Sequence, residues 1–480
     1  MNIRLVLNFL GKLFLIEAAL MLPALGVSLS YGQGDAPAFL LAILTIAVIS
    51  LPLIFFCRSK DQQMYAREGL AVAGLGWLLM SLLGGLPLVY NGSCSFVDAF
   101  FEITSGLTTT GATILTDIES LPNGILFWRS FTHWIGGMGV LVFTTAILPS
   151  IGGRGAHLAR AESPGPTFSK LTPKLGDTAK VLYLIYFALT LIETIALLLA
   201  GLSLYDAIIH AFGTAGTGGF SNRALSIGAY NNLAVEIIIS VFMFLFGVNF
   251  AVFFKLILRD FKGAFKNQEL KTYAAITLVS ILLLSLSLIS YYGDFLTSLR
   301  YAMFQVPTIM STTGYATADF NLWPSFSKML LLALMLFGAC AGSTAGGLKM
   351  TRLVMLFKMV RRELRRTFQP RKVEVIKLDG KTVPEETLSQ VSILFVCHIC
   401  LIIFGSLIVT LEGVSITTAF TTSLTCLSNV GPGLEVVGPM GSFAGYSAAT
   451  KVFLSLLMLA GRLELYPILI LFSPAAWRRG

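Results

Sequence analysis

Charged residues are scarce in this sequence. Asp, Glu, Lys and Arg together make up only 12% of the 480 residues, whereas a soluble domain normally carries about 25%. Apolar residues account for 55%, and the mean hydropathy is +0.80. This composition excludes a soluble fold. It predicts an all-α integral membrane protein with many spans, because a helix satisfies its own backbone polar groups in lipid.

Residues that form catalytic or cofactor sites are also few. Cys397 and Cys400 have the spacing of a metal or redox motif, but they lie in one apolar run without a second pair, which favours a role in helix packing. No GxxxxGK[ST] phosphate-binding loop occurs. The four histidines lack metal-ligand spacing: His133, His157, His210 and His398. The sequence therefore predicts no enzyme and no organic cofactor.

Ten apolar runs are long enough to be membrane spans, since the hydrocarbon core of a bilayer is about 30 Å thick. The first run is too long for a secretory signal and lacks a small-residue cleavage site, so we count it as a span. We expect spans near residues 5–30, 37–57, 68–90, 124–148, 178–201, 231–257, 272–292, 326–360, 390–411 and 449–473.

One short segment recurs four times between these spans. The copies are DAFFEITSGLTTTG, DAIIHAFGTAGTGG, YAMFQVPTIMSTTG and TAFTTSLTCLSNVG, each with alanine in second place. Roughly ten apolar residues cannot cross the membrane, so each segment must enter and turn back. The copies end at Gly111, Gly219, Gly314 and Gly431.

These four turns predict a pore. Non-helical backbone inside a membrane is tolerated only where protein buries it or water reaches it. Glycine permits the dihedrals that aim carbonyls inward, and rings of carbonyls replace the water shell of a potassium ion. The alternative is that the segments are small-residue faces where ordinary helices pack; four copies in register favour the pore. The predicted ion-binding residues are Thr109, Thr110, Gly111, Thr217, Gly218, Gly219, Thr312, Thr313, Gly314, Asn429, Val430 and Gly431.

The repeats divide the chain into five parts. Each repeat consists of a helix, a half-length helix, a filter loop and a second helix, and a helix pair without a half-helix precedes the first repeat. The predicted bounds are 1–62 for the pair and 63–153, 175–262, 268–366 and 386–480 for pore repeats 1 to 4.

Basic residues predict the orientation. They follow each of the first three repeats, and the densest stretch, RRELRRTFQPRK, begins at Arg361 and ends at Lys372. The positive-inside rule then places these loops and both termini in the cytoplasm, with the half-helices entering from outside. Topology explains the net charge of +9 without nucleic acid. Because the densest stretch exceeds what orientation requires, it is also a candidate dock for an acidic partner or anionic lipid.

The second helix of repeat 3 contains ten residues without a large side chain, from Gly338 to Gly347, and Lys349 follows closely. Poor helix propensity predicts an unwound segment inside the membrane; the alternative is a close helix-crossing face. With Arg462 in the last span, the candidate gating residues are Gly338, Gly342, Ser343, Thr344, Gly346, Gly347, Lys349 and Arg462.

Arg462 and Asn249 are polar side chains deep in apolar spans. A charge there costs about 2.5 to 3.5 kcal/mol, so Arg462 is expected to face a water-filled cavity or a partner. Glu464 lies about 200° around the helix and is a poor partner. Asn249 either lines the pore or makes an interhelical hydrogen bond. Glu17 and Glu193 have no assigned role.

The four TTTG-like turns, the run from Trp134 to Gly139, the GACAGSTAGGLK segment and the final GRLE resemble the membrane subunit of bacterial Trk-type potassium uptake systems, in the superfamily that also holds Ktr and HKT transporters. The resemblance covers essentially the whole chain, and the N-terminal helix pair is more similar to the Trk branch. Of the four filter loops, Ser428 to Gly433 departs most from the TTTG form.

The resemblance implies a pseudo-fourfold pore, filter glycines at the four positions above, and a gating loop beside Arg462. It also implies a homodimer in the bacterial inner membrane, bound to cytosolic regulatory subunits of the NAD- or ATP-binding class. Glycine at all four positions, instead of serine, favours potassium over sodium. We therefore predict potassium-selective translocation for uptake. The alternative is a symporter that couples potassium to sodium or protons, but that class predicts inverted halves, whereas these repeats run in one orientation.

Overall fold

The computed structural model describes residues 1–59, 66–139, 175–372, 374–464 and 468. These residues form helices joined by loops, with one small hairpin of strands β1 (Lys377–Leu378) and β2 (Lys381–Thr382). The predicted all-α class is confirmed. The predicted spans 124–148 and 449–473 extend beyond the described residues, as do parts of the predicted units 1–62, 63–153 and 386–480.

The long apolar helices are the N-terminal pair and the first helix of each repeat. Six helices of the described chain are long and apolar enough to cross a membrane, or seven if one bent pair is counted. In the N-terminal pair, α1 (Ile3–Leu20) and α2 (Leu22–Tyr31) form one span, which packs against α3 (Ala36–Phe56). The first helices of the repeats are α4 (Ala66–Gly84) continued by α5 (Leu86–Tyr90), α10 (Leu175–Leu199), α15 (Gln268–Tyr292) and α19 (Glu385–Thr410).

Each repeat then has a short helix of 12 to 16 residues. At 1.5 Å per residue these helices are about 18 to 24 Å long, too short to cross the hydrocarbon core. Each starts at a side chain that accepts a hydrogen bond from the N–H three residues later, which satisfies one free donor of the first turn: Ser95, Ser203, Asp294 and Ser415. The half-helices are α6 (Phe96–Leu107), α11 (Leu204–Gly216), α16 (Phe295–Met310) and α20 (Ile416–Ser428).

The second helices differ from one repeat to the next. Helix α7 (Asn123–Met138) is continuous in the described chain, and α21 (Ala448–Arg462) ends at Arg462, which is half-buried. Helices α12 (Leu233–Phe246) and α13 (Phe250–Ile257) meet at a bend of 94°. Helix α17 (Ser325–Met335) is separated from α18 (Met350–Phe368) by an irregular segment, residues 336–349.

The predicted span 231–257 is therefore wrong as a continuous helix, whereas the interruption predicted within 326–360 is present. The run 231–257 breaks at Gly247, where a side chain would lie 2.3 Å from the hydroxyl oxygen of Tyr273, and the Asn249 side chain caps α13 by accepting from Ala251 N. The run 326–360 contains the irregular segment that the small residues from Gly338 to Gly347 predict, between an 11-residue helix and a basic one. Hydropathy averaged over a window does not register such local breaks.

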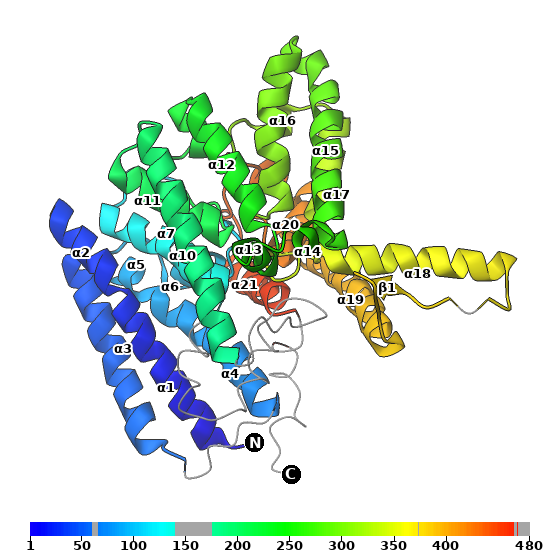
Figure 1. Ribbon diagram of the computed structural model, residues 1–480. Helices are drawn as coiled ribbons and strands as arrows, with labels where there is room; N and C mark the ends of the chain where they lie inside the picture. Colours follow the sequence, from blue (N-terminus) through cyan, green and yellow to red (C-terminus); the bar gives the residue numbers. More distant parts are fainter. Residues whose placement is uncertain (60–65, 140–174, 373, 465–467, 469–480) are drawn as a thin grey trace.

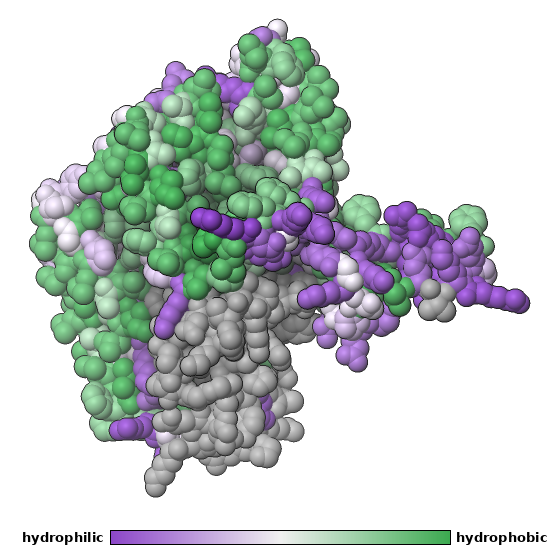
Figure 2. Space-filling view, viewed as in Figure 1, coloured by the Kyte–Doolittle hydropathy of each residue, from purple (hydrophilic) through white to green (hydrophobic). Residues whose placement is uncertain are grey.

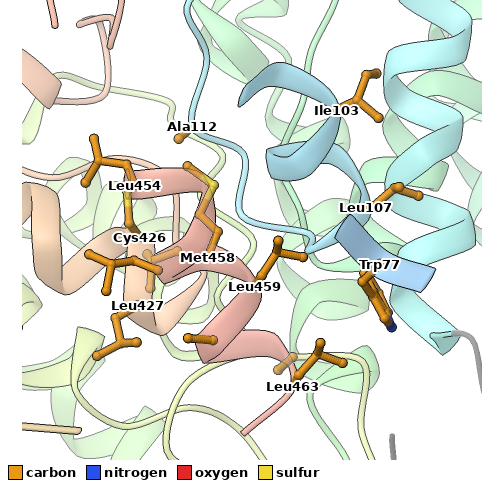
Figure 3. Packing of buried hydrophobic residues seen from close by; sticks show 14 of the residues in the cluster. Trp77, Ile103, Leu107, Ala112, Cys426, Leu427, Leu454, Met458, Leu459 and Leu463 are labelled. Atoms are coloured by element: carbon orange, nitrogen blue, oxygen red, sulfur yellow. The ribbon is translucent and has the colours of Figure 1, made fainter. Parts of the chain in front are cut away.

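Helix α18 projects from the helical body (Figure 1), and in Figure 2 that arm is largely hydrophilic whereas the body is largely hydrophobic. Short helices complete the chain: α14 (Phe261–Phe265), η2 (Ser226–Tyr230), η3 (Phe320–Leu322) and η4 (Glu435–Val437). The last helix closes the arrangement of repeats. Figure 3 shows Met458 and Leu459 of α21 between Leu427 of α20 and Leu107 of α6, so repeats 4 and 1 share one apolar core.

Candidate functional site

The four filter loops have the same backbone conformation. Two residues before each glycine, a residue other than glycine has a left-handed φ of 55° to 57°, and the glycines have φ between 76° and 97°. A residue other than glycine in this region is strained by about 1 to 3 kcal/mol, and such strain gathers at functional sites. The left-handed residues are Thr109, Thr217, Thr312 and Asn429. The fourth loop, which departs most in sequence, has the same geometry as the others.

The four loops form a closed ring, as the space around each glycine shows. An added Cβ on Gly111 would lie 2.0 Å from the carbonyl oxygen of Gly218, and one on Gly219 would lie 2.1 Å from that of Thr313. On Gly314 it would lie 2.2 Å from the oxygen of Val430, and on Gly431 2.6 Å from that of Thr110. Each neighbour is the residue just before the next repeat's glycine. The order is therefore repeat 1, 2, 3, 4 and back to 1.

The half-helices end at this ring. Their last residues and the loops that follow are almost entirely buried. The carboxyl end of a helix carries a partial negative charge of about half an elementary charge, which favours a cation nearby. The predicted filter residues thus lie together where four such helix ends converge, with backbone oxygens close to one another.

On one side of the ring lies a cavity of about 290 Å³, which we call the vestibule. All four filter glycines line it. Most of the other lining residues belong to the segments just after these glycines. Arg129 from α7 and the segment from Val437 to Phe443 complete the lining. The ring is therefore open toward this side.

On the other side lies the segment 336–349, which we call the gating loop after the role that the sequence predicts for it. Its base is held by a bridge between Phe337 and Leu348, with Gly338 N donating to Leu348 O at 2.7 Å. Near its end, Gly346 N donates to the Thr312 hydroxyl at 2.7 Å, and a Cβ on Gly346 would lie 2.8 Å from the carbonyl oxygen of Ser428. The gating loop thus packs directly against filter loops 3 and 4.

The space at this place is nearly filled. The cavity there is about 10 Å³, lined by Ala345, Gly346, Gly347, Lys349, Gly461, Arg462 and Glu464. This is about the least volume that holds one water molecule. The buried Lys349 ammonium donates to the carbonyl oxygen of Ala345. Among the described residues, the space between the gating loop and Arg462 is thus too small for more than about one water molecule.

Arg462 connects the gating loop to repeat 1. Its Nη1 donates to Thr344 O at 2.7 Å, and its Nη2 donates to Gly136 O at 2.6 Å and to Gly137 O at 3.0 Å. The charged side chain therefore has backbone carbonyls as partners and also borders the small cavity. Asn249 lies beside the gating loop, where a Cβ on Gly342 would be 3.1 Å from its Oδ1, and Phe250 N donates to Gly342 O.

Two carboxylates near the gating loop are not predicted from the sequence. Oε1 of Glu269, in the first turn of α15, accepts from Ala341 N at 2.6 Å, from Thr351 N at 3.0 Å and from the Thr351 hydroxyl. Glu464, judged a poor partner for Arg462, forms an ion pair at 2.5 Å with Arg352 of α18. Glu269 resembles an ordinary acidic residue of a first helical turn, and its partners are 72 and 82 positions away. No local signal identifies it.

The two acids without an assigned role lie elsewhere. Glu17 is buried beside Gly84, and Glu193 is buried in α10. Neither lines the vestibule or the small cavity.

Comparison with known proteins places these features in a family. Residues 36–479 match the family TrkH, described as a cation transport protein. The Trk system potassium uptake protein TrkH of Salmonella typhimurium is 38% identical over the full length of both chains, and that of Halomonas elongata is 36% identical over the same extent. The crystal structure of the potassium transporter TrkH from Vibrio parahaemolyticus superimposes with a TM-score of 0.88 at 32% identity, covering all of both chains.

Proposed function

This chain belongs to the TrkH family of cation transport proteins, and from that premise we propose that it is the potassium-conducting pore subunit of a Trk-type uptake system in the bacterial cytoplasmic membrane. It is a multi-pass membrane protein and a transporter, not an enzyme. The observation that carries the proposal is the closed ring of four filter loops with one shared backbone conformation.

Ion selection follows from how tightly the ring is packed. Each filter glycine lies so close to the next loop's carbonyl that a side chain would push the loops apart. Backbone oxygens held at fixed separation replace the hydration shell of an ion of matching size and field strength. We propose potassium at the twelve filter residues predicted above. The cyclic order of four repeats in one orientation does not favour the symporter alternative, which needs two inverted halves.

Gating is proposed to occur by withdrawal of the gating loop. It is rich in glycine and packs against filter loops 3 and 4 next to the ring. Arg462 stabilises the closed position by hydrogen bonds to carbonyls, and its positive charge raises the barrier for a nearby cation. Movement of the gating loop requires that these bonds and those to Glu269 break together.

A cytosolic regulatory subunit of the nucleotide-binding class is the proposed source of that movement, with the pore chain forming a homodimer. Helix α18 supports this proposal, because it follows the gating loop directly and is basic and amphipathic. Its first turn is attached to Glu269 and Glu464. Because α18 begins directly after the gating loop, a displacement of α18 also moves the end of that loop. The positive-inside rule puts α18 and the termini in the cytoplasm.

Flux from liposomes at a fixed membrane potential tests the function. We expect potassium flux well above sodium flux, with a reversal potential that follows the potassium gradient alone. A shift of the reversal potential with sodium or pH would indicate coupled transport and would overturn the channel-like mechanism. Absence of potassium flux, even after the gating loop is shortened, would overturn the pore assignment itself.

A further inference from the structure

The position nine residues before each filter glycine is polar in all four repeats. In chain order the residues are Glu102, His210, Gln305 and Thr422, and all four side chains are fully buried in the half-helices. Burying a polar group costs free energy unless it is hydrogen-bonded. Four buried polar residues at equivalent positions in an apolar protein therefore indicate that this position supports the filter loops.

In repeat 1 this residue holds the far end of its own filter loop. The Glu102 carboxylate accepts from Ile114 N at 3.0 Å and from the Thr113 hydroxyl at 3.0 Å. Thr113 and Ile114 are the second and third residues after Gly111. Repeat 2 has a comparable link, since His210 Nε2 lies 3.0 Å from the hydroxyl oxygen of Ser221, the second residue after Gly219.

Arg129 of α7 joins these two arrangements. Its Nε donates to Glu102 at 2.5 Å, and its Nη1 donates to Ser221 O at 3.0 Å. The guanidinium carbon lies 3.7 Å from the centre of the Phe220 ring. One planar side chain therefore binds the carboxylate behind filter loop 1 and the backbone just beyond filter loop 2. Lysine has no such fork of donors.

Repeats 3 and 4 have different chemistry at this position. In the described chain neither amide atom of Gln305 has a hydrogen-bond partner, and the Thr422 hydroxyl lies 2.8 Å from the Tyr446 hydroxyl of its own repeat. The charged link is thus specific to loops 1 and 2. Arg129 also borders the vestibule, and its charge is balanced by Glu102.

We propose that the buried Glu102–Arg129 pair sets the separation of filter loops 1 and 2, and thereby the discrimination between potassium and sodium. The two residues are positioning residues, because they act through backbone oxygens and do not touch the ion. The inference rests on the proposed pore function. The charge of the pair and its geometry can be tested separately. Glu102 neutralises the charge of Arg129, whereas the two donor groups of Arg129 connect the loops.

The test is the potassium-to-sodium permeability ratio of purified protein in liposomes, for Arg129→Lys, Arg129→Gln, Glu102→Gln and the double variant E102Q/R129Q. The double variant restores neutrality and avoids an unpaired buried charge, which makes it the variant that keeps the test decisive if a single variant fails to fold. Arg129→Lys keeps the charge but loses the fork. The matched control is the double variant E236Q/R300Q, which removes an ion pair of the same chemistry whose residues do not line the vestibule.

We expect the ratio to fall about fivefold in Arg129→Lys and in E102Q/R129Q, the factor that corresponds to the loss of one buried hydrogen bond. The control should keep the parent ratio. A purely structural pair would lower thermal stability in the variants and leave the ratio unchanged, and that result would overturn the inference. If the parent protein itself does not prefer potassium, the proposed function fails first, so the two failures are distinguishable.

Discussion

The four repeats are alike at the filter ring and unlike beyond it. At the ring, the left-handed residues differ in φ by only 2° among repeats. On the far side, α7 is continuous, α12 and α13 meet at 94°, α17 gives way to the gating loop, and α21 carries Arg462. A spherical ion needs matched oxygens on every side, so selection keeps the loops alike. Blocking a passage needs only one obstacle, which leaves the other repeats free to diverge.

The space on each side of the ring reflects this difference. The vestibule has about 290 Å³ and is lined by residues from all four repeats, whereas the cavity beside the gating loop has about 10 Å³ and is lined by residues of repeats 3 and 4. The vestibule thus has room for a hydrated ion, and the cavity beside the gating loop does not. We propose that selectivity and closure reside in different residues, and the predictions below test that separation.

The largest expected effect is on the ring itself. Gly314→Ser adds a Cβ 2.2 Å from the oxygen of Val430, a distance that real Cβ atoms do not tolerate, so the loops must move apart. If this weakens potassium coordination by about 1.4 kcal/mol, preference over sodium falls about tenfold. Relative permeability in liposomes measures it. Gly293→Ser is the control, because Gly293 also has a positive φ of 75° but nothing lies within 4 Å of its added Cβ.

An unchanged permeability ratio in Gly314→Ser would contradict the filter assignment of that residue. A loss of selectivity that also occurs in Gly293→Ser would indicate general backbone strain. Either result would break the comparison, because the likeness of the four loops would then have no consequence for selection.

The sequence predicts the ring better than anything around it, and the reason is physical. Strained turns at a fixed distance from a helix start require glycine at one place, so the requirement is local and recurs with each repeat. The contacts of Arg129 with Glu102 and Ser221, and those of Glu269 with Ala341 and Thr351, join residues that are 27 to 92 positions apart. Such contacts leave no local pattern, since a buried carboxylate looks like any other acid in the chain. Asn249 is intermediate: its polarity is visible in the sequence, but the bend that it caps is not.

The second prediction concerns the far side of the ring. Arg462→Gln removes the charge and weakens three hydrogen bonds to backbone carbonyls, so the closed position of the gating loop is less stable. Glutamine keeps an amide donor and thus part of this stabilisation, so we expect a net loss of about 1.4 kcal/mol and a rise in basal potassium flux on the order of tenfold. Deleting 341–345 should raise it similarly. In both variants the potassium-to-sodium ratio should stay at the parent value.

Lys451→Gln is the matched control for Arg462. Lys451 lies on the same helix α21 but pairs with Asp98 at the start of α6, away from the gating loop. Its loss should leave basal flux unchanged. If Arg462→Gln and the deletion both fold and conduct no faster than the parent, the gating loop is only a packing element and closure must be sought elsewhere.

A smaller effect is expected at Glu269. Glu269→Ala leaves Ala341 N and Thr351 N without their acceptor, whereas Glu269→Gln keeps an amide oxygen in place. Losing a buried acceptor costs about 1 to 3 kcal/mol per donor. Part of this cost also falls on the open position of the gating loop, so the closed position loses only the difference. We therefore expect basal flux to rise a few-fold, and in the alanine variant only. Glu464→Gln tests the attachment of α18 separately from the hydrogen bond to Ala341, because Glu464 holds α18 through Arg352. Equal flux in the alanine and glutamine variants would contradict a role for the hydrogen bonds.

The smallest effect per residue is expected from the exposed arginines of α18, the helix proposed to bind the cytosolic partner. The arginines of this helix are of two kinds. Arg362 is buried and pairs with Glu385 at the start of α19, so it attaches α18 to the body. Arg361 and Arg366 are exposed.

Neutralising Arg361, Arg362, Arg365 and Arg366 together therefore mixes a structural change with a docking change. Exposed charges contribute roughly 0.2 to 1 kcal/mol each to association and are screened by salt. We expect the double variant R361Q/R366Q to weaken co-purification of a cytosolic nucleotide-binding subunit several-fold at moderate salt, with basal flux unchanged. Arg362→Gln should instead alter basal flux, because it loosens α18 from α19. If R361Q/R366Q retains its partner while Arg362→Gln loses it, the arrangement of α18 and not its exposed charge is what the partner recognises.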